Sequence, residues 1–139
     1  MKRKLEFSSH PANLSILRKF VRGFLTELNT PEDDVDLLVL GIDEACTNII
    51  RHAYDDEETH LITVVCEHSG DAVEFRLRDY GAHTHVAEMV GRALETVKPG
   101  GLGIHLIRSA FDSVSYCHKS RGTELILQKR IAGGAVAKA

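Results

Sequence analysis

The spacing of apolar residues predicts a strand and then a helix at the start of the chain. Leu5 and Phe7 alternate with polar residues over residues 4–8, as in a short strand. Pro11 suits the start of a helix. The apolar positions that follow recur at helical spacing, as on one face of an amphipathic helix: Leu14, Leu17, Val21, Phe24, Leu25 and Leu28. We therefore expect this helix to pack on a core.

A second helix is predicted from about residue 30 to about Ala53. Thr30 offers a capping hydroxyl and Pro31 is expected at the first helical position, a combination typical of a helix start. Apolar residues are nearly continuous in this segment and include one stripe at helical spacing: Val35, Leu38, Ile42, Ala45, Cys46 and Ile49. A helix of this composition should be mostly buried.

Two hairpins are predicted in the remainder of the chain. The β-rich runs are residues 61–68 with 72–78, and residues 114–118 with 123–131, and each pair is joined by a turn that contains glycine. Between the hairpins we expect a short helix over residues 86–95, a glycine-rich segment, and a further helix to about Phe111.

These elements favour an α+β fold. The helices cluster before and between the hairpins instead of alternating with parallel strands, which indicates a two-layer α/β sandwich. We expect a mixed sheet of about five strands, covered on one face by helices. A chain of 139 residues fits one domain, here residues 1–131. Residues 132–139 have little to bury and are expected to form a flexible tail.

Composition excludes several classes of protein. Hydrophobic residues make up 43% and charged residues 27%, as in an ordinary globular protein. The net charge of −3 and the lack of long basic runs argue against nucleic acid as a partner. Cys46, Cys66 and Cys117 are far apart in apolar stretches, so we expect reduced core thiols. No apolar run approaches the length of a membrane span, which predicts a cytoplasmic protein with no membrane partner.

Polar residues interrupt the second helix on one face. Glu44 and Asn48 are four positions apart, so they project side by side, roughly opposite the apolar stripe. Gly41 lies on the same face, where its missing side chain is expected to leave room for something to approach. This pattern fits a ligand site, but the spacing alone fits a solvated polar face better.

Two further segments admit both a functional and a structural interpretation. Asp79 falls on the apolar side of its strand, where a carboxylate should be paired, hydrogen-bonded or ligand-bound, and Gly81 allows close backbone approach. The same residues also suit a plain turn. The glycine-rich residues 99–103 open a helix and could offer N–H groups to phosphate, or serve as a flexible connection.

The order of these segments resembles a known family. DEACTNIIRHAY at residues 43–54, RDYG at 78–81, PGGLGIHLI at 99–107 and GT at 122–123 resemble the successive boxes of the GHKL ATPases. The similarity is greatest to the bacterial anti-sigma-factor serine kinases and covers residues 7–131. It implies the Bergerat type of ATP-binding sandwich, with ATP and Mg²⁺ as cofactors.

The resemblance also implies roles for individual residues. Asn48 stands where the family coordinates Mg²⁺, and Glu44 where it takes up the proton of the attacking serine hydroxyl. Asp79, with Gly81 beside it, stands where the family binds the adenine amino group. The backbone N–H groups that cradle the phosphates correspond to Gly101, Leu102 and Gly103.

Two assignments from the resemblance have equally simple structural alternatives. Thr123 corresponds to a family position near the base, but a threonine is also common at the start of a strand. Arg18 corresponds to an arginine used near the phosphate or the partner protein, although a solvated helix charge explains it at least as well.

The resemblance implies a kinase that sequesters a sigma factor and phosphorylates a serine of an anti-sigma-factor antagonist. Relatives are commonly homodimers, so a homodimer is also expected. The alternative is a non-catalytic nucleotide-binding or partner-sequestering module of the same fold. Glu44 favours the enzyme, whereas the unusual Ala-His-Thr-His at residues 82–85 and a short lid favour the module. The ATPase domain of a sensor histidine kinase is disfavoured, because no phospho-accepting helical hairpin precedes it.

Overall fold

The computed structural model describes residues 1–81 and 102–131 of the chain. The elements in chain order are β1 (Lys2–Ser8), the 3₁₀ turn η1 (Pro11–Asn13), α1 (Leu14–Glu27), α2 (Glu32–Asn48), the π-helical turn η2 (Ile49–Ala53), β2 (Leu61–Ser69), β3 (Ala72–Arg78), α4 (Leu102–Ala110), β4 (Ser113–His118) and β5 (Thr123–Arg130). The predicted helix over residues 86–95 and the predicted tail over residues 132–139 lie outside the described residues.

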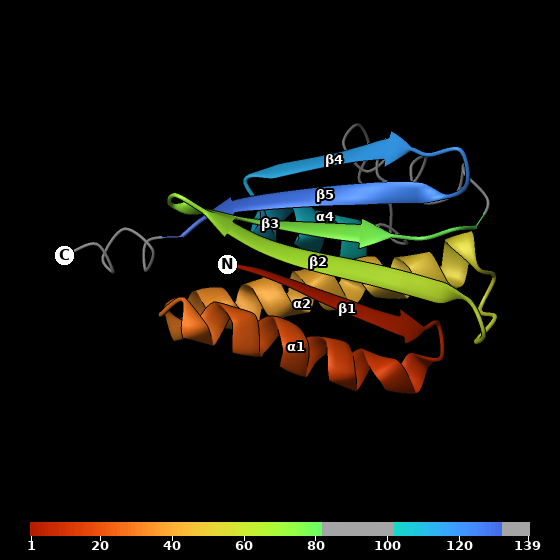
Figure 1. Ribbon diagram of the computed structural model, residues 1–139, viewed down its shortest axis with the longest axis horizontal. Coiled ribbons are helices and arrows are strands. Elements are labelled where there is room, and N and C mark those ends of the chain that lie inside the picture. Colours follow the sequence, from red (N-terminus) through yellow and green to blue (C-terminus); the bar gives the residue numbers. More distant parts are fainter. Residues whose placement is uncertain (82–101, 132–139) are drawn as a thin grey trace.

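The strands form one sheet, and the helices α1, α2 and α4 lie together on one face of it (Figure 1). The strand order is β1-β2-β3-β5-β4. The predicted α+β two-layer sandwich with a five-stranded sheet is therefore confirmed. The expectation of a mixed sheet is wrong for the described strands, because every neighbouring pair is antiparallel. β5 lies between β3 and β4, so these two strands run parallel but do not pair.

The core lies between the helices and the sheet, as the apolar spacing predicts. On α1 the inward residues are buried, with Leu14 only partly so, and the whole predicted stripe of α2 is buried. Val73, Phe75 and Leu77 of β3 are fully buried, which confirms the alternation predicted for that strand. Phe75 joins the layers, because its ring meets Phe24 edge-on at 6.2 Å and Phe111 at 5.9 Å.

The start of α2 differs from the prediction. Pro31 is the residue before the helix, with extended backbone (ψ of 142°), and its carbonyl accepts the first helical hydrogen bond, from the N–H of Val35. The Thr30 hydroxyl caps nothing and has no hydrogen-bond partner within the described residues. The N–H of Thr30 is bonded to the carbonyl of Leu25 at the end of α1, which holds Thr30 against α1. Three acidic residues in the first turn instead complement the helix dipole.

Cys117 also differs from the prediction of a core thiol. Cys46 and Cys66 are buried free cysteines, but Cys117 is exposed. It lies on β4, which forms an edge of the sheet and pairs only with β5. Its neighbours in the sequence do not bury it, because Tyr116 and His118 are themselves exposed. Within the described residues, no helix is long and apolar enough to cross a membrane.

Candidate functional site

Glu44 and Asn48 lie one turn apart near the end of α2, and both are half-buried. Neither side chain forms a hydrogen bond or ion pair with another residue in the described ranges 1–81 and 102–131. A carboxylate and an amide oxygen are thus held side by side without a protein partner in that part of the chain. The α-helix changes to a π-helical turn immediately after Asn48, a type of irregularity often found at functional sites.

Gly41 serves a different purpose from the one predicted. A Cβ atom at this residue would lie 2.9 Å from Cε2 of Phe111 and 3.1 Å from the Cβ of Ala110. The missing side chain therefore admits the end of α4 against α2. Gly41 does leave room for close approach, as predicted, but the space is filled by α4 and not by a ligand.

Arg18 connects α1 with the turn of α2 that carries Glu44. Its guanidinium Nη1 donates to Oδ1 of Asp43 at 2.9 Å, and the Arg18 side chain remains 47% exposed. The structure thus pairs Arg18 with a residue adjacent to Glu44, instead of leaving it as an isolated surface charge. Because the Arg18 side chain is about half exposed to solvent, the contribution of this pair to stability should be small.

Asp79 and Thr123 lie side by side and are both 2% exposed. The Asp79 N–H donates to the Thr123 carbonyl at 3.0 Å, and the Thr123 N–H donates to the Asp79 carbonyl at 3.3 Å. The Asp79 carboxylate also accepts the N–H of Gly81 at 3.0 Å. The structure therefore brings together Asp79, Gly81 and Thr123, which the family resemblance places at or near the adenine base.

Two glycines make this arrangement possible. A Cβ atom at Gly122 would lie 1.9 Å from the carbonyl oxygen of Asp79, and Gly122 has a φ of +82°. A Cβ atom at Gly81 would lie 2.4 Å from the carbonyl oxygen of Ala53. The segment after β3 therefore packs directly on the end of η2. The helix that carries Glu44 and Asn48 thus continues through η2 to a contact with Gly81.

Tyr54 is a residue whose role the sequence reasoning missed. It follows η2, is 4% exposed, and bonds through its hydroxyl to the N–H of Tyr80 at 2.7 Å and to the carbonyl of Leu61 at 2.5 Å. Burial, and secondarily the nearby charge of Asp79, raise the pKa of the Tyr54 phenol. Its position at the end of the 43–54 motif was the available signal.

The predicted phosphate-binding segment is described only in part. Gly101 and residues 82–85 lie outside the described residues. Leu102 and Gly103 are the first two residues of α4, so a helix opens at the end of the glycine-rich run, as predicted. α4 lies beside α2 on the helical face of the sheet (Figure 1).

A cavity of about 370 Å³ lies beside Gly81, at the end of η2. Tyr54, His60, Tyr80 and Arg121 contribute to its walls. Glu44, Asn48 and Asp79 are not among its lining residues. The cavity therefore adjoins the candidate site without containing its central polar groups. No cluster of three or more His, Cys, Asp or Glu that could hold a metal ion occurs in the described part of the chain.

The family is shown by comparison with known proteins. The sequence profile described as histidine kinase-like ATPase domain matches residues 7–129. This chain belongs to that family, which confirms the resemblance drawn from its motifs.

Curated relatives match over nearly their whole length. The chain is 29% identical to the anti-sigma F factor of Oceanobacillus iheyensis over 133 residues, covering 92% of this chain and 91% of that protein. It is 26% identical to the serine-protein kinase RsbW of Bacillus velezensis over 147 residues, covering 96% of this chain and 88% of that protein. The names of these two relatives agree with the resemblance of the sequence motifs to the anti-sigma-factor serine kinases.

A solved structure supports the fold. The crystal structure of the RsbU and RsbW domains of a Mycobacterium tuberculosis protein matches with a TM-score of 0.69 at 20% identity. The match covers 94% of this chain but only 32% of that longer chain. At this identity the likeness establishes the fold alone.

Proposed function

We propose that this protein is an ATP-dependent serine kinase that binds Mg-ATP, sequesters a sigma factor, and phosphorylates a serine of an anti-sigma-factor antagonist. One observation supports the proposal above the others. Glu44 and Asn48 have no hydrogen-bond or ion-pair partner within the described residues, and the same helix continues through η2 to the segment that runs from the buried Asp79 to Gly81. One continuous helical element thus joins a candidate catalytic end to a candidate base-binding end.

The base-binding end is proposed to recognise adenine. Asp79 is buried and its backbone is fixed by Thr123, so its carboxylate has a defined direction. A carboxylate only accepts hydrogen bonds, and the amino group of adenine donates them. Gly81 lets the backbone approach closely, and Thr123 is proposed to lie near the base.

The catalytic end is proposed to act on the phosphates. The half-buried amide oxygen of Asn48 is a hard ligand suited to Mg²⁺, which would neutralise charge on the phosphates. Glu44, one turn away, would accept the proton of the attacking serine hydroxyl. Arg18, held beside Glu44 by Asp43, is proposed to meet the phosphate or the partner protein.

The glycine-rich entry to α4 is proposed to cradle the phosphates. Backbone N–H groups at a helix N-terminus favour anions, and these would come from Gly101, Leu102 and Gly103. The sigma factor and its antagonist as partners belong to the same proposal, which the names of the relatives support. A homodimeric state and a cytoplasmic location are proposed with it.

Phosphoryl transfer to a co-purified antagonist tests the proposal. A pull-down with this protein as bait identifies its partners, and mass measurement with and without Mg-ATP then detects a phosphorylated serine. The kinase proposal predicts phosphate on the antagonist only when ATP is present. Tight partner and nucleotide binding with no transfer would instead support the non-catalytic module.

A further inference from the structure

The hydroxyl of Tyr54 joins two segments that are distant in sequence. It accepts a hydrogen bond from the N–H of Tyr80 and donates one to the carbonyl of Leu61 at the start of β2. The ring of Tyr54 also packs on Gly81, since a Cβ atom there would lie 3.1 Å from two of its carbons. Tyr54 thus contacts both residues that follow Asp79.

Each residue from Asp79 to Gly81 is held by a different contact. Thr123 bonds the backbone of Asp79, Tyr54 bonds the N–H of Tyr80, and the Asp79 carboxylate bonds the N–H of Gly81. The side chain of Tyr80 makes a separate contact, in which its ring lies 4.6 Å from the guanidinium of Arg78. The Tyr54 hydroxyl therefore adds a hydrogen bond to the packing of Gly81 on the end of η2.

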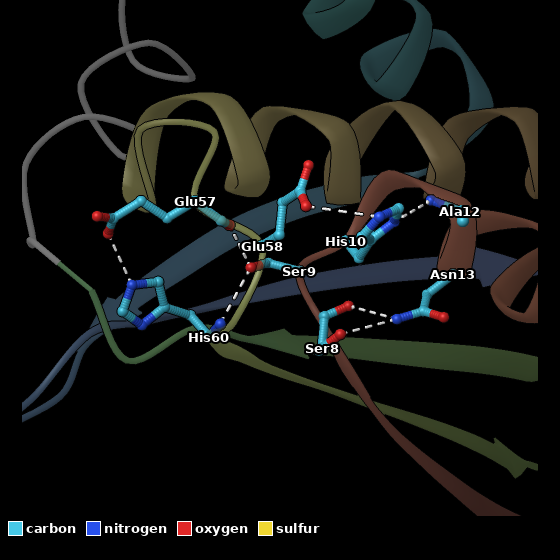
Figure 2. A network of polar contacts seen from close by, with 8 residues as sticks. All are labelled: Ser8, Ser9, His10, Ala12, Asn13, Glu57, Glu58 and His60. Atoms are coloured by element: carbon cyan, nitrogen blue, oxygen red, sulfur yellow. Dashed lines mark hydrogen bonds and ion pairs between the residues drawn. The ribbon is translucent and has the colours of Figure 1, made fainter.

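Contacts with His60 hold Tyr54 itself in place. Its ring stacks on His60 at 4.7 Å with an interplanar angle of 18°. His60 bonds Glu57 at 2.7 Å between Nε2 and Oε1, and its backbone N–H donates to Oγ of the fully buried Ser9 at 3.1 Å. Figure 2 shows the His60 ring bonded to the Glu57 carboxylate, and the His60 N–H and the Glu57 carbonyl both bonded to Oγ of Ser9, which follows β1. Tyr54 is thus supported by the loop before β2 and cannot easily rotate away.

We propose that Tyr54 is a positioning residue for adenine recognition. By holding the peptide between Asp79 and Tyr80, it fixes the direction of the Asp79 carboxylate. This inference rests on the proposed function, in which Asp79 binds the base. A tyrosine phenol is protonated at neutral pH, so the hydroxyl can both donate and accept.

The test compares Tyr54→Phe with the wild-type protein. The change keeps the ring and its packing but removes both hydrogen bonds, and Tyr116→Phe removes an exposed hydroxyl as the matched control. Dissociation constants for Mg-ATP and Mg-GTP are measured well below the melting temperature of each variant. We expect about tenfold weaker ATP binding in Tyr54→Phe, as for the loss of one well-made hydrogen bond, with a smaller change for GTP. Tyr116→Phe should leave both constants unchanged.

The ratio of the two constants separates positioning from a purely structural role. A role in stability alone would lower the melting temperature and leave the ATP-over-GTP ratio of the folded protein unchanged, and that result would overturn the inference. A wild-type protein without any preference for ATP would instead overturn the adenine role of Asp79, and the inference with it. If Tyr54→Phe does not fold, His60→Ala removes the stacked ring and should lower the same ratio to a smaller extent; an unchanged ratio there refutes the inference.

Discussion

A methyl group at residue 122 should be much more damaging than one at residue 70. Both glycines have positive φ, +82° at Gly122 and +62° at Gly70, a conformation that costs a residue with a side chain about 1–2 kcal/mol. Nothing lies within 4 Å of a Cβ atom at Gly70. Gly70→Ala therefore measures the conformational cost by itself.

Gly122→Ala adds a second cost. The new Cβ atom would lie 1.9 Å from the carbonyl oxygen of Asp79 and 2.6 Å from Cα of Tyr80, which are backbone atoms that cannot rotate away. Overpacking typically costs about 1–3 kcal/mol. We expect Gly122→Ala to destabilise the protein by about 2–5 kcal/mol in total, and to disturb the pairing of Asp79 with Thr123.

Urea denaturation of the two variants and the wild type measures this difference. The free energy of unfolding should fall more in Gly122→Ala than in Gly70→Ala, with similar dependence on urea. Equal losses in the two variants would refute the close approach of residue 122 to Asp79, and with it the described geometry of the base-binding end.

Two further predictions concern the metal and the buried thiols. ATP at about 100 times its dissociation constant should stabilise the wild type by about 2.7 kcal/mol. Asn48→Ala should abolish the part of this gain that requires Mg²⁺, and thermal unfolding with ATP and either Mg²⁺ or EDTA detects it; an intact Mg²⁺ effect would exclude Asn48 as the ligand. Burial raises the pKa of the Cys66 thiol from 9.0 to about 12. Because the unfolded thiol ionises first, the free energy of unfolding should fall as the pH rises through this range, and Cys66→Ala should show a shallower fall. Identical slopes would contradict the burial of this thiol.

The sequence predicts the helices and strands well because the residues on the buried face of each element recur at a regular spacing. The stripes of α1 and α2 and the alternation in β3 each follow one face of a regular element, and the structure buries those faces. The mixed sheet was predicted wrongly for the described strands because local periodicity does not determine which strands pair or in which direction they run. Cys117 was misplaced for a related reason, since apolar neighbours do not distinguish an edge strand from a central one.

The candidate site is harder to predict from the sequence than the fold. The motifs locate Asp79, Gly81 and Thr123. The structure joins Asp79 to Thr123 by backbone hydrogen bonds, and Gly81 to the Asp79 carboxylate through its N–H. Gly41 was misinterpreted because a missing side chain looks the same whether a helix or a ligand fills the space. Tyr54 was missed because its role depends on the distant partner Tyr80, which no local pattern reveals.

The most direct test of the account is the rate of phosphoryl transfer in Glu44→Gln. The change keeps the size of the side chain but removes the basic oxygen, and Glu32→Gln on the exposed start of α2 is the matched control. With saturating Mg-ATP and antagonist, we expect transfer at least ~100-fold slower in Glu44→Gln, the lower range for lost general-base catalysis, with Mg-ATP binding retained. Wild-type transfer rates in Glu44→Gln would contradict the assignment of Glu44 as the base.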